Sequence, residues 1–323
     1  MSRFLVNIAY KLYINYMSMK KILIVILLYL IIPKTVFCQK NGFIKTEDGV
    51  LHYQIYGKGE PLLIINGGPG LDCEGFVSLA KLLSDKYMTI LFDQRGTGES
   101  KLNRTDSTTV SMRLMAKDIE AIRKYLKIDK WVVLGHSFGG WMAEYYATQY
   151  PESIKAMILS STGGIDLSIL NYFTANLRAR LSQTERDSLD YYSRKLKNDT
   201  TSNTRYKWAK YLASAYVYDK QYVPDIAKRL AFSPNPIITN LVYKDLHKTD
   251  FNCRETLRDF DKPVLIIQGR QDITGDGVAY EVHNVLKNSI IKFVNESVHY
   301  SWLEKEKEYK TEVERFITSV PRD

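Results

Sequence analysis

The chain has 323 residues, of which 45% are hydrophobic, and its formal net charge is +9. A chain of this length and apolar content can bury the core of one domain of about 250–300 residues. Aromatic residues are plentiful and no segment is low in complexity, which argues against long disordered regions. Residues 1–38 hold five basic side chains and no acid, so the remainder carries a net charge of only +4. More than half of the positive net charge therefore comes from the N-terminal segment, and the charge does not indicate a nucleic-acid-binding protein.

The N-terminus has the pattern of a targeting segment. A pair of lysines precedes an apolar run of 11 residues, 22–32, which is too short to span a membrane but matches the core of a signal peptide. We expect residues 1–38 to be a signal peptide that is cleaved between Cys38 and Gln39, so that the mature protein is secreted or periplasmic with no stable membrane span. An uncleaved anchor and a lipid anchor at Cys38 are the alternatives. Three methionines are candidate start residues: Met1, Met17 and Met19.

Seven short apolar runs predict strands. The central runs are continuously apolar rather than alternating, which is typical of strands buried on both faces of a parallel sheet. The predicted strands are residues 50–57, 61–67, 87–94, 130–137, 154–162, 262–270 and 289–297. Helical patterns lie between and after them, at 111–126, from Ser137 to Pro151, and at 304–318. This alternation predicts an α/β fold with a mostly parallel central sheet and flanking helices.

The alternation of strand and helix stops between residues 165 and 255. This stretch is rich in Tyr, Arg and Lys, has a helical character and contains no convincing strand. We interpret it as an inserted helical cap over the carboxyl ends of the strands, where it would shape a substrate site. The expected organisation is a first part of the core at 39–164, the cap at 165–255 and a second part of the core at 256–323.

The strongest local signal is the sequence Gly135 to Gly139, which reads G-x-S-x-G between a predicted strand and a predicted helix. In such a turn the serine hydroxyl stands free above the sheet, and the glycines let strand and helix approach closely. The N–H of Phe138 then points at the same spot from a helix N-terminus, which favours negative charge. We interpret Ser137 as a nucleophile; a tight structural turn is the alternative.

A serine nucleophile needs a base and an acid, which are expected in the chain order Ser, Asp, His. Of the five histidines, His299 follows the last predicted strand, where a loop can carry it over the sheet. We therefore expect His299 to be the base. Asp272 comes directly after the strand 262–270 and is the expected acid, with Asp276 as the alternative.

The sequence Asn66 to Gly70, NGGPG, follows the apolar strand residues 61–65. Its glycines let the backbone approach a ligand closely, and Pro69 stiffens the turn. Acyl transfer needs a second backbone donor for the oxyanion, and this turn is the expected source. An ordinary Gly-Pro turn is the alternative.

Asp93 and Arg95 stand one residue apart at the end of an apolar strand. Two charges this close to a buried strand are costly unless they are paired. We expect them to form a buried or half-buried polar network that holds their loop against the turn at 66–70. A direct catalytic role is not expected, because the three catalytic positions are already filled.

The ordered set NGGPG, DQRGTGES, GHSFGG, GRQD and the late His299 resembles the α/β-hydrolase fold, and more narrowly the proline iminopeptidase family of serine aminopeptidases. The resemblance runs in order from roughly residue 42 to residue 318 and implies that fold with an inserted helical cap. It implies release of an N-terminal proline or small hydrophobic residue from peptides, without a metal or organic cofactor. The implied roles are Ser137 as nucleophile, Asp272 as acid, His299 as base, and the N–H groups of Gly68 and Phe138 as oxyanion donors.

Two positions depart from that family's pattern. Asn66 stands where the family usually has histidine, and Leu212 stands where it has a cap glutamate that binds the substrate's amino group. A buried ammonium without a carboxylate partner loses roughly a few kcal/mol. A carboxylesterase or lactonase with the same triad is therefore the alternative function, and a binding protein with little turnover is a third. The expected partner is a small peptide or ester and not a nucleic acid, and the oligomeric state is left open.

Overall fold

The computed structural model describes residues 40–321. The predicted signal peptide, the cleavage point after Cys38, the lipid anchor and the alternative start residues all lie outside the described residues. No helix between residues 40 and 321 is long and apolar enough to cross a membrane.

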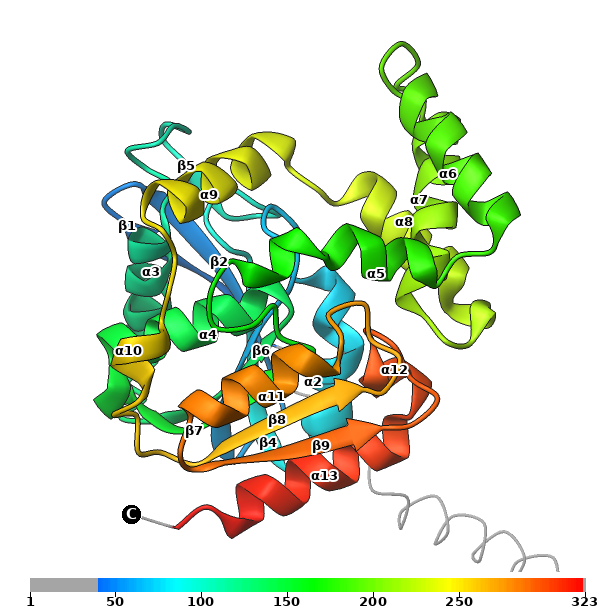
Figure 1. The fold of residues 1–323 in the computed structure, drawn as a ribbon. Coiled ribbons are helices and arrows are strands. Elements are labelled where there is room, and N and C mark those ends of the chain that lie inside the picture. Colours follow the sequence, from blue (N-terminus) through cyan, green and yellow to red (C-terminus); the bar gives the residue numbers. More distant parts are fainter. Residues whose placement is uncertain (1–39, 322–323) are drawn as a thin grey trace, which may run out of the picture. The chain divides into compact units, whose positions relative to one another are not determined.

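Within residues 40–321, nine strands form one sheet in the order β1-β2-β4-β3-β6-β7-β8-β9, with β5 paired to β2 (Figure 1). The neighbours from β4 through β3 and β6 to β9 run parallel, whereas β2 pairs antiparallel with β1, β4 and β5. The strands are β1 (Lys40–Thr46), β2 (Gly49–Tyr56), β3 (Glu60–Ile65), β4 (Tyr87–Phe92), β5 (Lys101–Leu102), β6 (Trp131–His136), β7 (Ile154–Ser160), β8 (Val264–Gly269) and β9 (Ser289–Val294). The predicted fold class is confirmed.

The sequence patterns located seven of these strands and missed β1 and β5. Strand β1 lies at the edge of the sheet and buries only one of its faces: Ile44 is buried, while its neighbour Phe43 is 56% exposed. A strand of this kind, with Lys40 and Lys45 near its two ends, lacks the apolar run that marked the central strands. Strand β5 has two residues and is too short to leave any pattern.

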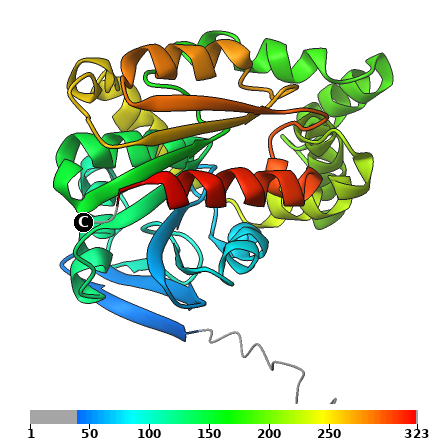
Figure 2. The same ribbon diagram turned by 90° about the horizontal axis from the view of Figure 1, so that it is seen from below.

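The sheet is covered on both faces, which explains its continuously apolar strands. Leu63 and Ile65 of β3 belong to one hydrophobic cluster, and Leu62 and Ile64 belong to the other. Successive side chains of a strand point to opposite faces, so a strand buried on both sides must be apolar at every position. The first cluster includes α3 (Met112–Tyr125), α4 (Phe138–Gln149) and α11 (Asp276–Val285). The second includes α2 (Val77–Leu83) and α13 (Glu306–Ser319), the red helix that crosses the sheet in Figure 2.

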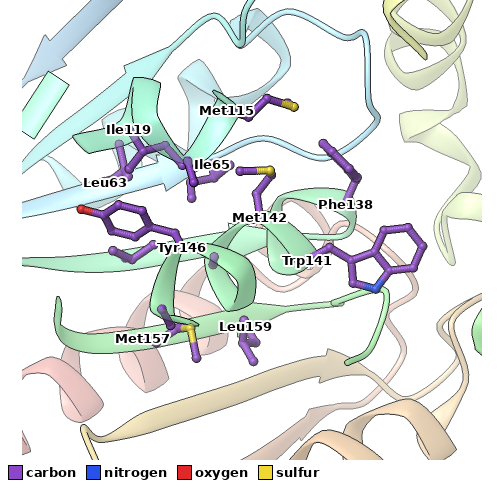
Figure 3. Packing of buried hydrophobic residues seen from close by; sticks show 14 of the residues in the cluster. Leu63, Ile65, Met115, Ile119, Phe138, Trp141, Met142, Tyr146, Met157 and Leu159 are labelled. Carbon is purple, nitrogen blue, oxygen red and sulfur yellow. The ribbon is translucent and has the colours of Figure 1, made fainter. Parts of the chain in front are cut away.

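Helix α4 packs against β3, β7 and helix α3. Figure 3 shows the side chains of Met142 and Tyr146 from α4 among Ile65 of β3, Ile119 of α3 and Met157 of β7. All five side chains are buried. A close-packed interior resists displacement, so the first residues of α4 are held rigidly at the carboxyl ends of the strands.

Between β7 and β8, where every residue is described, the chain forms helices and no strand of the sheet. The elements there are η3 (Ser168–Asn171), α5 (Phe173–Ala179), α6 (Gln183–Lys195), α7 (Ser202–Tyr216), η4 (Lys220–Tyr222), α8 (Val223–Phe232), α9 (Pro236–Lys248) and α10 (Arg254–Leu257). The shorter elements elsewhere are η1 (Glu74–Phe76), η2 (Pro151–Ser153) and α12 (Ser301–Glu304). We keep the name cap for residues 165–255; its role as a separate domain stays a prediction.

Candidate active site

Ser137 occupies the sharp turn between β6 and α4, with φ 56° and ψ −119°. A positive φ is strained for a residue that carries a side chain, and the surrounding glycines permit it. A Cβ at Gly135 would lie 2.2 Å from the carbonyl oxygen of Gly139, and a Cβ at Gly139 would lie 2.1 Å from that of Ile65. The two glycines of the motif are therefore required by close backbone contacts. The turn places Ser137 at the carboxyl end of β6.

A pocket opens beside Ser137. Its walls come from α4 and from the cap, and most of them are aromatic or aliphatic. The lining residues are Ser137, Phe138, Trp141, Gly163, Ile169, Leu170, Phe173, Tyr216, Tyr243 and Thr274, none of which carries a charge. Burial raises the pKa of both tyrosines, Tyr216 and Tyr243, so their hydroxyls stay neutral. The pocket is suited to an uncharged, largely apolar group.

His299 lies in the loop after β9 and is almost fully buried. Its Nδ1 is 2.9 Å from Oδ1 of Asp272, which follows β8. Its backbone N–H donates to the carbonyl of Tyr216 at 3.1 Å, and the two rings are 5.3 Å apart. Because Tyr216 and Ser137 line the same pocket, the structure brings His299 and Asp272 to the site of the elbow serine. A carboxylate at Nδ1 favours the tautomer that carries its proton there.

The alternative acid and two of the other histidines have different partners. Asp276 begins α11 and forms an ion pair with Arg270 at 2.8 Å. His52 is paired with Asp93 at 2.9 Å, and His283 contacts the first residue of β9 at 2.7 Å. Among residues 40–321, no group of three or more His, Cys, Asp or Glu side chains is arranged to hold a metal ion.

His136 precedes Ser137 and is buried against His299. Its ring centroid is 4.6 Å from that of His299 and 4.7 Å from that of Trp302. Burial lowers the pKa of His136 well below its ordinary value, and the nearby His299 and Arg229 add to this shift. The ring is therefore neutral and packs edge-to-face against His299, which restricts the orientation of that imidazole.

The turn at residues 66–70 lies against the elbow. A Cβ at Gly67 would lie 2.7 Å from the Cβ of Ser137, and Gly68 has a φ of 77°, which favours glycine. Phe138 is the first residue of α4, so its N–H has no partner within the helix. The structure thus places the turn that carries Gly68 next to Ser137, and the N–H of Phe138 lies one residue after Ser137 at the start of α4.

Asp93 is the centre of a buried polar network. It accepts hydrogen bonds of 2.9 Å each from the backbone N–H groups of Cys73 and Glu99 and from the ring of His52. His52 and Cys73 belong to segments that are distant in sequence, and Glu99 lies in the same loop as Asp93. Asp93 therefore ties its loop to β2 and to the segment that follows the 66–70 turn.

Arg95 makes a different contact from the one that the sequence predicted. Its guanidinium points to α3, where it forms two hydrogen bonds of 2.7 Å with the carboxylate of Asp118. The residue between the two charges, Gln94, makes the predicted contact with the turn, donating from Nε2 to the carbonyl of Asn66 at 2.9 Å. The difference follows from side-chain length. The long side chain of Arg95 reaches the buried carboxylate of Asp118 on α3, whereas the shorter amide of Gln94 reaches only the adjacent turn.

Several residues of the site come from the cap, and the sequence did not identify them. Tyr216, Tyr243 and Arg229 lie on α7, α9 and α8, in helices without a recognisable motif. Leu212, which stands at the family's glutamate position, is half-buried beside a small apolar cluster that contains Leu177, and it does not line the pocket. No local pattern could have placed these side chains, because their positions depend on how the cap helices pack.

Comparison with known proteins gives a consistent set of relatives. A family model described as alpha/beta hydrolase fold matches residues 60–305. A proline iminopeptidase of Heyndrickxia coagulans is 25% identical over 296 residues, covering 87% of this chain and 99% of the relative. A proline iminopeptidase of Saccharolobus solfataricus is 27% identical over 287 residues, covering 83% and 88% respectively.

Two solved structures share the fold. An alpha/beta fold family hydrolase from Bacillus anthracis superposes with a TM-score of 0.69 at 23% identity, covering 86% of this chain and 99% of that one. A proline iminopeptidase from Mycobacterium smegmatis has a TM-score of 0.68 at 18% identity, covering 86% and 98%. The resemblance inferred from the motifs therefore extends over most of the chain.

Proposed function

The chain belongs to the alpha/beta hydrolase fold family, and on that premise we propose that it is a serine hydrolase of the proline iminopeptidase type. In this proposal it releases an N-terminal proline or another small apolar residue from peptides through an acyl-enzyme. The observation that carries the proposal is the buried pairing of His299 with Asp272 beside the pocket that Ser137 lines.

The reaction has two halves. Ser137 Oγ attacks the carbonyl carbon while Nε2 of His299 takes the hydroxyl proton, and Asp272 holds the imidazole and stabilises its cation. The N–H groups of Gly68 and Phe138 bind the oxyanion of the tetrahedral intermediate. His299 then gives its proton to the leaving amine, and the C–N bond breaks. In the second half water attacks the acyl-serine, His299 takes a proton from it, and Ser137 leaves with that proton.

A carboxylesterase or lactonase on the same triad is the second candidate. The uncharged lining of the pocket and the position of Leu212 outside it favour this reading. An aminopeptidase substrate brings an ammonium group, which is costly to bury without a carboxylate partner. A neutral acyl group carries no such cost.

Three substrates separate the two candidates: proline p-nitroanilide, its N-acetylated form and p-nitrophenyl butyrate. An aminopeptidase cleaves proline p-nitroanilide with the highest kcat/KM and loses the activity when the amine is acetylated. If the simple ester is the better substrate, or if acetylation has no effect, the esterase reading replaces it. Ser137→Ala should abolish all turnover, and Ser107→Ala, at an exposed serine, should leave it unchanged.

The proposed location is outside the cytoplasm, after removal of residues 1–38. The basic start and the apolar run 22–32 support this proposal. N-terminal sequencing of the exported protein should begin at Gln39. An intact N-terminus in the cell pellet would contradict cleavage, and a lipid on Cys38 would indicate an anchored protein instead.

A further inference from the structure

The turn at residues 66–70 is held from outside by the cap. Three of its backbone carbonyl groups accept hydrogen bonds from α8, from α9 or from the connection between these helices. Arg229 Nη2 donates to Gly67 O at 3.3 Å, Thr239 Oγ1 to Pro69 O at 2.6 Å, and the N–H of Asn235 to Gly70 O at 2.7 Å. The cap therefore fixes the turn as well as lining the pocket.

The contact of Arg229 has a specific consequence, because the carbonyl of Gly67 and the N–H of Gly68 belong to one peptide group. That group is planar and trans, so its C=O and N–H point in opposite directions. A hydrogen bond to the oxygen fixes the direction of the N–H on the other side. A cation at the oxygen also polarises the group, which strengthens the N–H as a donor.

The surroundings of Arg229 hold a guanidinium in place. The group lies over the ring of Phe76, 4.7 Å from its centroid, and Nη1 is 3.4 Å from the hydroxyl of Tyr300. Gly75 leaves the space that the side chain fills, since a Cβ there would lie 2.3 Å from Nε of Arg229. Stacking on an aromatic face and a planar fork of donors are properties of arginine that lysine does not share.

We propose that Arg229 is a positioning residue of this hydrolase, which orients and polarises the Gly67–Gly68 peptide group so that its N–H meets the oxyanion. The inference rests on the proposed function, because it requires the N–H of Gly68 to be an oxyanion donor. It gives the cap a part in the chemical step in addition to substrate binding.

Arg229→Met tests the inference, with Lys228→Met on the exposed side of the same helix as its control. Removal of one oxyanion donor costs about 100- to 1000-fold in kcat, and a misoriented donor loses part of that. We expect Arg229→Met to lower kcat about tenfold with KM within about twofold, because the lost interaction acts on the transition state. The affinity for a boronic acid that forms a tetrahedral adduct with Ser137 should fall by the same factor. Lys228→Met should change neither value.

Gly75→Ala is an independent test that keeps the arginine. The added Cβ displaces the guanidinium from its place on Phe76, so kcat should fall while KM stays nearly constant. This variant decides the question if Arg229→Met does not fold. A normal kcat in the folded variants, or a rise in KM alone, overturns the inference.

The two proposals fail in different ways. Turnover that survives Ser137→Ala refutes the serine mechanism itself. Loss of turnover in Ser137→Ala together with a normal kcat and normal boronic acid affinity in Arg229→Met refutes only the role of Arg229.

Discussion

Replacing Arg95 by methionine should destabilise the fold by about 3–5 kcal/mol. The guanidinium forms two 2.7 Å hydrogen bonds with the carboxylate of Asp118, and the two side chains are only 3% and 4% exposed. Methionine fills much of the same volume, but it leaves the carboxylate buried without a counter-charge. The cost therefore comes from the abandoned Asp118 rather than from lost packing.

Urea unfolding measures this cost. With a slope of about 3 kcal/mol per molar urea, the midpoint should fall by about 1–1.7 M. Arg104→Met is the matched control, because Arg104 pairs with Asp106 at a site where the arginine side chain is 69% exposed. Exposed pairs contribute about 0–1 kcal/mol, so the control should move the midpoint only slightly.

The double variant Arg95→Met with Asp118→Leu separates the two explanations. Removing both charges should recover most of the loss, because an apolar pair needs no compensation in the interior. About 1–2 kcal/mol should remain, since the carbonyl of Thr109 and the carboxylate of Asp48 also lose Arg95 as a donor. Two results would refute the reasoning. One is a loss of under about 1 kcal/mol in the free energy of unfolding of Arg95→Met. The other is a loss in the double variant that equals the sum of the losses in the two single variants. Gln94 of the same loop contacts the 66–70 turn, so kcat should fall together with the stability of the loop. Substrate preference should stay unchanged.

Three further changes test the site and its support. Asp272→Asn should lower kcat by about 10⁴-fold, whereas Asp276→Asn should leave kcat nearly unchanged. Steady-state kinetics on the folded variants measures both values, and equal losses would contradict the assignment of Asp272 as the acid. Gly139→Ala should abolish the elbow, because its Cβ meets backbone 2.1 Å away, whereas Gly277→Ala meets nothing within 4 Å and should be tolerated in thermal unfolding. The pKa of His136 is lowered by burial, so below its ordinary value of 6.5 the unfolded chain binds a proton that the folded chain does not. The free energy of unfolding should therefore fall below pH 6.5 by up to about 1.4 kcal/mol per pH unit, and His136→Phe should reduce this slope in urea titrations at several pH values; an unchanged slope would contradict it.

Features that depend on residues adjacent in sequence could be predicted. The central strands are apolar at successive positions, as at Leu62 to Ile65, because each face of the sheet meets its own layer of helices. The elbow at Ser137 needs its glycines for contacts within one strand–turn–helix unit. Such signals are local, so a single sequence contains them in full.

Contacts between distant segments could not be predicted from sequence. Arg229 and Gly67 are 162 positions apart, and nothing near either residue indicates that they meet. The same holds for Arg95, whose buried charge required a partner that the sequence did not identify as Asp118. Composition can state that a buried charge must be paired, but only the packing of the helices decides which carboxylate reaches it.

The two departures from the iminopeptidase pattern have different physical weight. Asn66 is fully buried, its Nδ2 donates across the turn to the carbonyl of Leu71 at 3.1 Å, and its own carbonyl accepts from Gln94. The proposed oxyanion donors are backbone N–H groups, so the side chain at position 66 is needed only to close the turn. The amide of Asn66 does this without a histidine. Leu212 can supply no charge from any rotamer, and no lining residue of the pocket replaces it. In the proposed mechanism, the change at Asn66 therefore leaves the backbone donors in place, while the change at Leu212 bears on which acyl group the site accepts.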